Sequence, residues 1–122
     1  MLLNNFFYID QVIADESSIK ADIRVNRNHP ILVGHFPEQP IVPGVCMLEM
    51  LKEVIQFNYN KKYQLESASM IKFLTMFAPP QFTSASFNIQ INPFESNKLQ
   101  VNASLNSDDT IFLKFKGVFI EK

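Results

Sequence analysis

The side chains best suited to acid–base chemistry lie in one short stretch, from His35 to Glu49. Three prolines within seven residues of this stretch, Pro37, Pro40 and Pro43, fix φ and stiffen the chain. A stiff loop can hold His35 at a set distance from the helix that we predict to follow it. An imidazole and a carboxyl group held in this way can move protons to and from a bound substrate.

The start of that predicted helix offers a second kind of chemistry. Gly44 lies there, where backbone N–H groups have no acceptor within the helix and the helix dipole is positive. Because Gly44 has no side chain, an acceptor oxygen can approach the backbone closely. Such donors stabilise negative charge that develops on a thioester carbonyl. Gly44 and Val45 are therefore candidate carbonyl-binding residues, although a glycine after Pro43 can equally be helix punctuation.

Each candidate also has a purely structural interpretation. A single histidine in a proline-rich loop is more often structural or exposed than catalytic. With about 100° of rotation per residue, a helix places Glu49 on one stripe with three other polar residues, Lys52, Glu53 and Gln56. Periodicity alone thus predicts a solvent-facing Glu49 that pairs with Lys52. Cys46 lacks a paired base and is expected to pack as a small apolar side chain.

One helix and several strands must position these residues. Residues 45–58 contain no proline or glycine and are rich in helix formers, which predicts a helix. A hydrophobic period of two predicts strands at residues 18–26, 87–91, 99–105 and 111–119. Less regular patterns predict extended chain at residues 6–14 and 67–78. We expect an α+β fold in which a mostly antiparallel sheet curls around one helix.

Composition limits the class of protein. The 122 residues, of which 47% are apolar and 19% charged, predict one globular domain over residues 1–122. A net charge of −1 provides no basic field for nucleic acid, and the single cysteine allows neither an internal disulfide nor a thiolate metal site. No metal or cofactor is expected. The chain shows no signal peptide and no apolar run of the ~20 residues that span a membrane, so a cytoplasmic protein is expected.

Residues 28–49 resemble the signature of the 3-hydroxyacyl-[acyl-carrier-protein] dehydratases of the FabA/FabZ type. In that family a histidine opens an H-F-P-G-x-P-x-x-P-G element, and an acidic residue follows fourteen positions after the histidine. His35 and Glu49 stand at this spacing, and five further positions match: Phe36, Pro37, Pro40, Pro43 and Gly44. A glutamate as the acid resembles the FabZ branch, because the FabA branch carries an aspartate.

The resemblance implies a hotdog fold and a dehydration without cofactor that gives a trans-2-enoyl thioester. His35 would take the proton from C2, and Glu49, kept partly protonated by a dry site and by Glu53, would donate to the leaving C3 hydroxyl. The Gly44 and Val45 amides would hold the thioester carbonyl. An acyl tunnel is expected beside the helix, with five lining residues: Phe36, Pro43, Phe73, Met76 and Phe77.

The resemblance also implies partners. The substrate would be carried by the phosphopantetheine of an acyl-carrier protein, or by coenzyme A, in fatty-acid, polyketide-like or aryl-polyene synthesis. A homodimer or higher homo-oligomer is expected, in which the histidine of one protomer meets the acid of the other and the polar helix stripe faces a partner and the tunnel. Lys61 and Lys62 could contact an acidic carrier, or be solvated charges at a helix end.

Three departures from the family pattern concern the surroundings of the site. Glu38 replaces the glycine after H-F-P, Glu53 replaces the usual glutamine four residues after the acid, and Pro80-Gln81 stand where Gly-Asp is expected. They affect the expected substrate more than the reaction class. Two alternatives to a dehydratase are a hotdog acyl thioesterase and a non-catalytic acyl-binding or assembly module.

Overall fold

The structure, a computed structural model, describes residues 1–34, 40–79 and 82–122. Within these residues the chain forms six strands and two helices. In chain order they are β1 (Phe7–Ala14), β2 (Ser18–Val25), α1 (Pro30–Gly34), α2 (Gly44–Tyr59), β3 (Tyr63–Phe73), β4 (Ser84–Phe94), β5 (Lys98–Ser107) and β6 (Thr110–Glu121).

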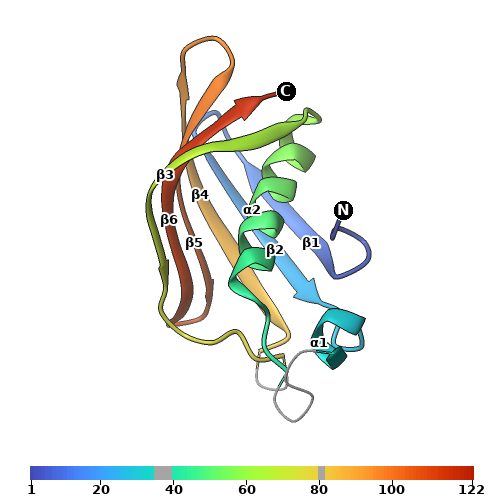
Figure 1. Cartoon of the computed structure of the whole chain (residues 1–122). Helices are drawn as coiled ribbons and strands as arrows, with labels where there is room; N and C mark the ends of the chain where they lie inside the picture. The colour runs from blue at the N-terminus through green and yellow to red at the C-terminus, as the bar shows by residue number, and fades with distance from the viewer. Residues whose placement is uncertain (35–39, 80–81) are drawn as a thin grey trace.

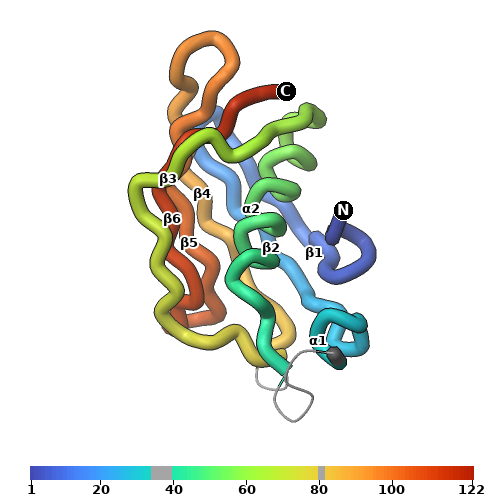
Figure 2. The backbone as a smooth tube through the Cα atoms, in the orientation of Figure 1, coloured from blue at the N-terminus to red at the C-terminus, as the bar shows by residue number. Residues whose placement is uncertain are grey.

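The six strands form one antiparallel sheet in the order β1-β2-β4-β5-β6-β3. The sheet curls around α2, which lies against its concave face (Figure 1; Figure 2 shows the same path as a tube). Alternate residues of the central strands, such as Ile23, Phe87 and Phe115, are buried with Met50 and Leu51 of the helix. The predicted α+β architecture, a hotdog fold, is confirmed.

Helix α2 agrees with the prediction to within one residue at each end. It begins directly after Pro43, whose φ of −62° suits the entry to a helix. It ends where Asn60 adopts the left-handed conformation, at φ 53°, and donates its N–H to the carbonyl of Gln56. Cys46 is buried in the core, as expected. Neither of the described helices is long and apolar enough to cross a membrane.

Two segments differ from the prediction. Strand β3 ends at Phe73, although residues 67–78 were expected to be extended. The chain then leaves the sheet, Phe77 accepts the Val42 N–H through its carbonyl at 2.8 Å, and its ring stacks on Phe112 in the core. Helix α1 was not predicted, yet Pro30 occupies the first helical position that proline favours.

His29, just before α1, is a structural histidine. Its Nδ1 accepts the Ile31 N–H at 3.1 Å, and its Nε2 is hydrogen-bonded to the side chain of Asn5. The ring of Phe6 packs edge-on against the imidazole. Both ring nitrogens are therefore used to join α1 to the chain that precedes β1.

Candidate active site

Two of the predicted site residues, His35 and Phe36, lie outside the described residues, as do Glu38 and Pro80-Gln81. The described part of the site is the first half of α2 with the segments that pack on it. It holds Glu49 and the two candidate carbonyl-binding residues, Gly44 and Val45.

Glu49 lies on the second turn of α2, with its side chain 35% exposed. Its Oε1 is 3.0 Å from the Nζ of Lys52, three residues later on the same helix. This is the ion pair that the helical periodicity predicted. Because both side chains are partly shielded from solvent, Lys52 is a persistent positive charge beside the carboxylate.

Glu53 departs from the prediction of a solvent-facing polar stripe, because its side chain is completely buried. The N-terminal segment lies over this turn of the helix, and its backbone supplies the partners. The Leu2 N–H donates to Oε2 at 3.0 Å and the Leu3 N–H donates to Oε1 at 2.7 Å. Helical periodicity could not reveal this contact, since its donors lie 51 and 50 residues away in the chain.

The Glu49 and Glu53 carboxyl groups share a hydrogen bond, and their pKa values move apart. Burial raises the pKa of Glu53, and the hydrogen bond with Glu49 raises it further, against the lowering effect of the two backbone donors. Burial also acts to raise the pKa of Glu49, but the hydrogen bond with Glu53 and the contact with Lys52 outweigh it and lower that pKa. Of the two carboxyl groups, Glu53 therefore has the higher pKa. This direction is opposite to the expected partial protonation of Glu49.

The start of α2 presents two backbone donors. The Pro43 carbonyl accepts the N–H groups of Cys46 and Met47, at 3.0 and 3.2 Å, whereas the N–H groups of Gly44 and Val45 donate to no group among the described residues. Pro43 offers no side-chain cap to satisfy them. Two neighbouring N–H groups at the positive end of a 16-residue helix can bind a carbonyl oxygen.

The ring of Phe73, at the end of β3, covers Gly44. A Cβ atom at residue 44 would lie 2.6 Å from Cζ of this ring, so only glycine allows the observed approach. The Phe73 side chain is nevertheless half exposed, and it borders the outside of the molecule as well as the helix. The structure thus brings together Gly44 and Phe73, which the sequence assigned to the carbonyl site and the tunnel.

The family of the chain follows from comparison with known proteins. Residues 11–111 match the sequence model of the ApeI-like family, described as ApeI dehydratase. The chain belongs to this dehydratase family. Membership confirms the predicted FabA/FabZ-type dehydratase and its reaction class, the dehydration of a 3-hydroxyacyl thioester.

Relatives in sequence and structure agree with this family. The chain is 33% identical over 115 residues to the 3-hydroxyacyl-[acyl-carrier-protein] dehydratase FabZ of Wolbachia sp. subsp. Drosophila simulans (strain wRi), covering 84% of this chain and 78% of the relative. It is 36% identical over 97 residues to FabZ of Wolbachia pipientis wMel, covering 70% and 66%. The dehydratase heterocomplex ApeI:P from Xenorhabdus doucetiae contains a chain of the same fold, with a TM-score of 0.70 at 12% identity and coverage of 93% and 82%.

The three remaining tunnel candidates of this ApeI-like dehydratase, Pro43, Met76 and Phe77, differ in how far they are buried. Pro43 is half-buried at the start of α2, and Met76 is exposed. Phe77 is completely buried and stacks on Phe112 with 4.4 Å between ring centres, so it is a core residue. The chain leaves the sheet after Phe73 and turns the Phe77 ring into the core of the protomer, and a role of Phe77 in lining a tunnel stays a prediction.

The raised pKa of Glu53 predicts how the stability of this ApeI-like dehydratase depends on pH. A carboxyl group whose pKa is raised by folding binds its proton more tightly in the folded state, so stability falls as pH rises from the unfolded pKa through the folded one. Glu53→Gln removes this ionisation and keeps a polar amide beside Leu2 and Leu3. We expect the melting temperature of the wild type to fall relative to that of Glu53→Gln by a few degrees between about pH 4.5 and pH 8.

Thermal unfolding followed by circular dichroism at several pH values measures this difference. Glu66→Gln is a matched control, because Glu66 contacts Lys98 at the protein surface and is not buried. Parallel curves for Glu53→Gln and the wild type across the pH range would mean that Glu53 does not retain a proton in the folded state.

Proposed function

We propose that this chain dehydrates a 3-hydroxyacyl thioester carried by an acyl-carrier protein, with His35 and Glu49 as the acid–base residues. The observation that supports it most directly is the pair of N–H groups at Gly44 and Val45, which have no acceptor among the described residues and lie on the same helix as Glu49. A thioester carbonyl bound there places the acyl carbons along the first turns of α2. The spacing of His35 and Glu49 in the FabA/FabZ-type signature supports their roles.

The proposed reaction is an elimination in which a named side chain accepts or donates each transferred proton. Neutral His35 takes the proton from C2, whose acidity is increased because the Gly44 and Val45 amides stabilise charge on the carbonyl oxygen. The C2–H electrons form the C2–C3 double bond and the C3–O bond breaks. The departing oxygen accepts a proton from Glu49 and leaves as water. The protonated His35 later returns its proton to the carboxyl pair through solvent.

The carboxyl pair supports the acid role in an unexpected way. The lowered pKa of Glu49 and the raised pKa of Glu53 favour a proton on Glu53, at the other end of their shared hydrogen bond. In our proposal, binding of the substrate hydroxyl beside Glu49 draws that proton along the hydrogen bond to Glu49. Glu53 is therefore the proton reserve, and its buried position keeps the proton from exchanging freely with solvent.

We further propose that the active species is a dimer joined at β3. This strand lies at one edge of the sheet, where one side of its backbone has no partner strand among the described residues. Leu65, Ile71 and Phe73 on β3 are large apolar residues left exposed. A second protomer paired along β3 would cover them and would approach Gly44 through Phe73. A homodimer is the simplest arrangement, and we expect it in the cytoplasm.

Mixing two inactive variants tests the shared site. A dimer of His35→Ala with Glu49→Gln has one site with both changes and one site with neither, if each site combines two protomers. After subunit exchange of equal amounts we expect recovery of about a quarter of the wild-type activity, because half of the dimers are mixed and half of their sites are intact. No recovery from exchanged subunits, or a fully active monomer in sedimentation experiments, would contradict the shared site.

The reaction itself is tested by incubating the purified protein with a 3-hydroxyacyl thioester. We expect an enoyl thioester, detected by its absorbance and by mass spectrometry. A free thiol without enoyl product would instead show a thioesterase. Binding of the thioester without any product would show a non-catalytic acyl-binding module.

A further inference from the structure

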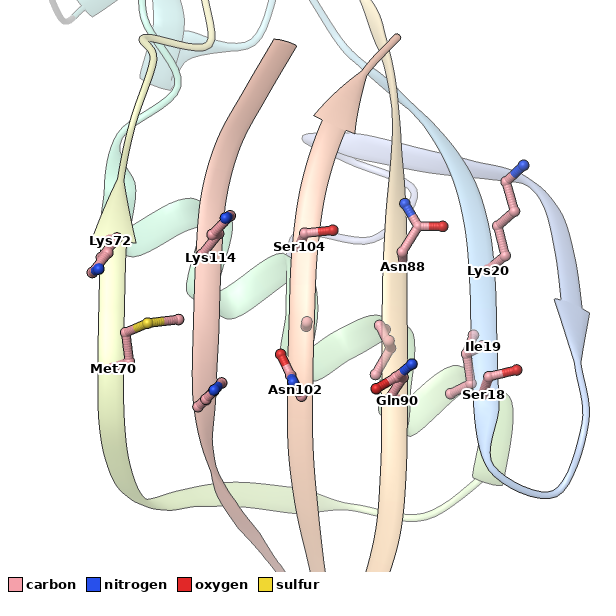
Figure 3. Close-up of a pocket in the computed structure, with 13 residues that line it drawn as sticks. Ser18, Ile19, Lys20, Met70, Lys72, Asn88, Gln90, Asn102, Ser104 and Lys114 are labelled. Atoms are coloured by element: carbon pink, nitrogen blue, oxygen red, sulfur yellow. The ribbon is translucent and has the colours of Figure 1, made fainter. Parts of the chain in front are cut away.

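The outer face of the sheet, which is turned away from α2, carries polar side chains in registered rows (Figure 3). One row crosses five strands, from β2 to the edge strand β3, through Lys20, Asn88, Ser104, Lys114 and Lys72. Lys116 lies in the next row, opposite Asn102. The two rows line a hollow of about 610 Å³ on this face.

Positive charge is concentrated in these rows. Lys20, Lys72, Lys114 and Lys116, which we call the lysine face, all line the hollow and are exposed. Among the described residues, no carboxylate lines the hollow and none of the four amino groups is in an ion pair. The chain as a whole has a net charge of −1, so this face differs sharply from the rest of the molecule.

An anionic surface would stabilise this arrangement. Lys72 and Lys114 stand directly opposite each other on neighbouring strands, and Lys116 lies two residues after Lys114 on the same face. Like charges at these positions repel. A second copy of the chain packed back to back with the rows in register would place lysines against lysines and would not relieve the repulsion. A partner rich in carboxylates would relieve it, and the Gln90 and Asn102 amides beside the lysines supply further hydrogen-bond donors.

The lysine face ends next to the candidate active site. Lys72 is the last lysine of the row and immediately precedes Phe73, whose ring covers Gly44 on the other side of the sheet. Because Lys72 and Phe73 are the last two residues of β3, a flexible group of a protein bound on the outer face can pass the end of this strand to reach the Gly44 and Val45 amides.

We propose that the lysine face docks an acidic protein, and that this protein is the carrier that brings the thioester to the site. The identification of the partner as the carrier rests on the proposed function. Charge complementarity and the position of Lys72 beside Phe73 support it. Lys61 and Lys62, which the sequence offered as an alternative contact, lie at the far end of α2 and serve as the comparison.

The experiment compares two substrates that differ only in the carrier. The same 3-hydroxyacyl group is supplied on an acidic acyl-carrier protein and on N-acetylcysteamine, which has no protein surface. For Lys114→Glu/Lys116→Glu we expect kcat/KM with the protein-borne substrate to fall about 10- to 100-fold, mainly through KM. With the small thioester we expect a change of less than about two-fold. The control Lys61→Glu/Lys62→Glu has the same charge change and should leave both substrates within about two-fold.

Several results would overturn the proposal. These are an unchanged KM for the protein-borne substrate, an equal loss with the two substrates, or an equal loss in the Lys61→Glu/Lys62→Glu control. If the reversal variant does not fold, the neutral Lys114→Gln/Lys116→Gln is used, with an expected loss of about 3- to 10-fold. If the wild type dehydrates neither substrate, the proposed function is wrong, and this result alone does not decide the docking proposal. Docking is then decided by calorimetric binding of the acidic carrier protein to the wild type and to the lysine variants.

Discussion

Glu49→Gln is expected to lower the rate of dehydration by roughly 10²- to 10⁴-fold, the usual contribution of a positioned acid–base group. Glutamine keeps the size of the side chain, and its carbonyl can still face Lys52, 3.0 Å from Oε1 in the wild type. It cannot deliver a proton to a leaving hydroxyl. His35→Ala is expected to give a loss of the same order, because the base that removes the C2 proton is then absent.

Steady-state rates with the small thioester and the circular dichroism spectrum of each variant check this expectation. Lys52→Met is the matched control, since it removes the charge beside Glu49 without removing an acid or a base. We expect it to raise the pKa of Glu49 and to shift the corresponding limb of the pH–rate profile to higher pH. Full activity in a folded Glu49→Gln protein would exclude Glu49 as the acid.

Gly44→Ala is expected to lower kcat by on the order of 10- to 10²-fold. The added Cβ would lie 2.6 Å from the Phe73 ring, so the ring must move, and the methyl group also crowds the position of the carbonyl oxygen. Both effects weaken the contact between the thioester and the two backbone donors. The fold should survive, because the half-exposed Phe73 ring has room to turn outward.

A double-mutant cycle separates the two effects. If the loss arises from the ring, Gly44→Ala should cost much less in a Phe73→Ala background. If the methyl group itself obstructs the carbonyl, the loss should be the same in both backgrounds. Wild-type kcat in the Gly44→Ala protein would show that the carbonyl binds elsewhere.

The architecture was largely predictable because it depends on local patterns. The strict alternation in β2, β4, β5 and β6 decides which side chains face the helix, and a run without proline or glycine determines α2. The end of β3 was missed because residues 74–79 remain apolar while leaving the sheet. An apolar run predicts that a segment is buried, as Phe77 is, but it does not show whether the buried segment is a strand or an irregular stretch packed on the core.

The candidate site could be proposed from its residue types, but its electrostatics could not be predicted. The spacing of Glu49 and Gly44 in the signature indicated the helix turns of the candidate site, and periodicity predicted the ion pair with Lys52. Burial raises the pKa of Glu53, and the Leu2 and Leu3 N–H groups partly oppose that effect. The sequence gives no reason to place either residue beside Glu53. The one available signal was the glutamate itself, since an acid in place of the family's glutamine indicates a changed set of partners.

The contact between Glu53 and the N-terminal segment uses main-chain donors. Substitutions and deletions in this segment are therefore expected to have different effects on activity. Amides at residues 2 and 3 are present whatever the side chains are, so apolar replacements of Leu2 and Leu3 should be tolerated in a mutational scan. Deletion of the same residues, or a fusion that redirects the chain before them, should behave like a substitution of Glu49, the proposed acid. Leu2 and Leu3 would thus score as neutral in a substitution scan, although the position of their backbone affects Glu53 and, through it, the proposed acid Glu49.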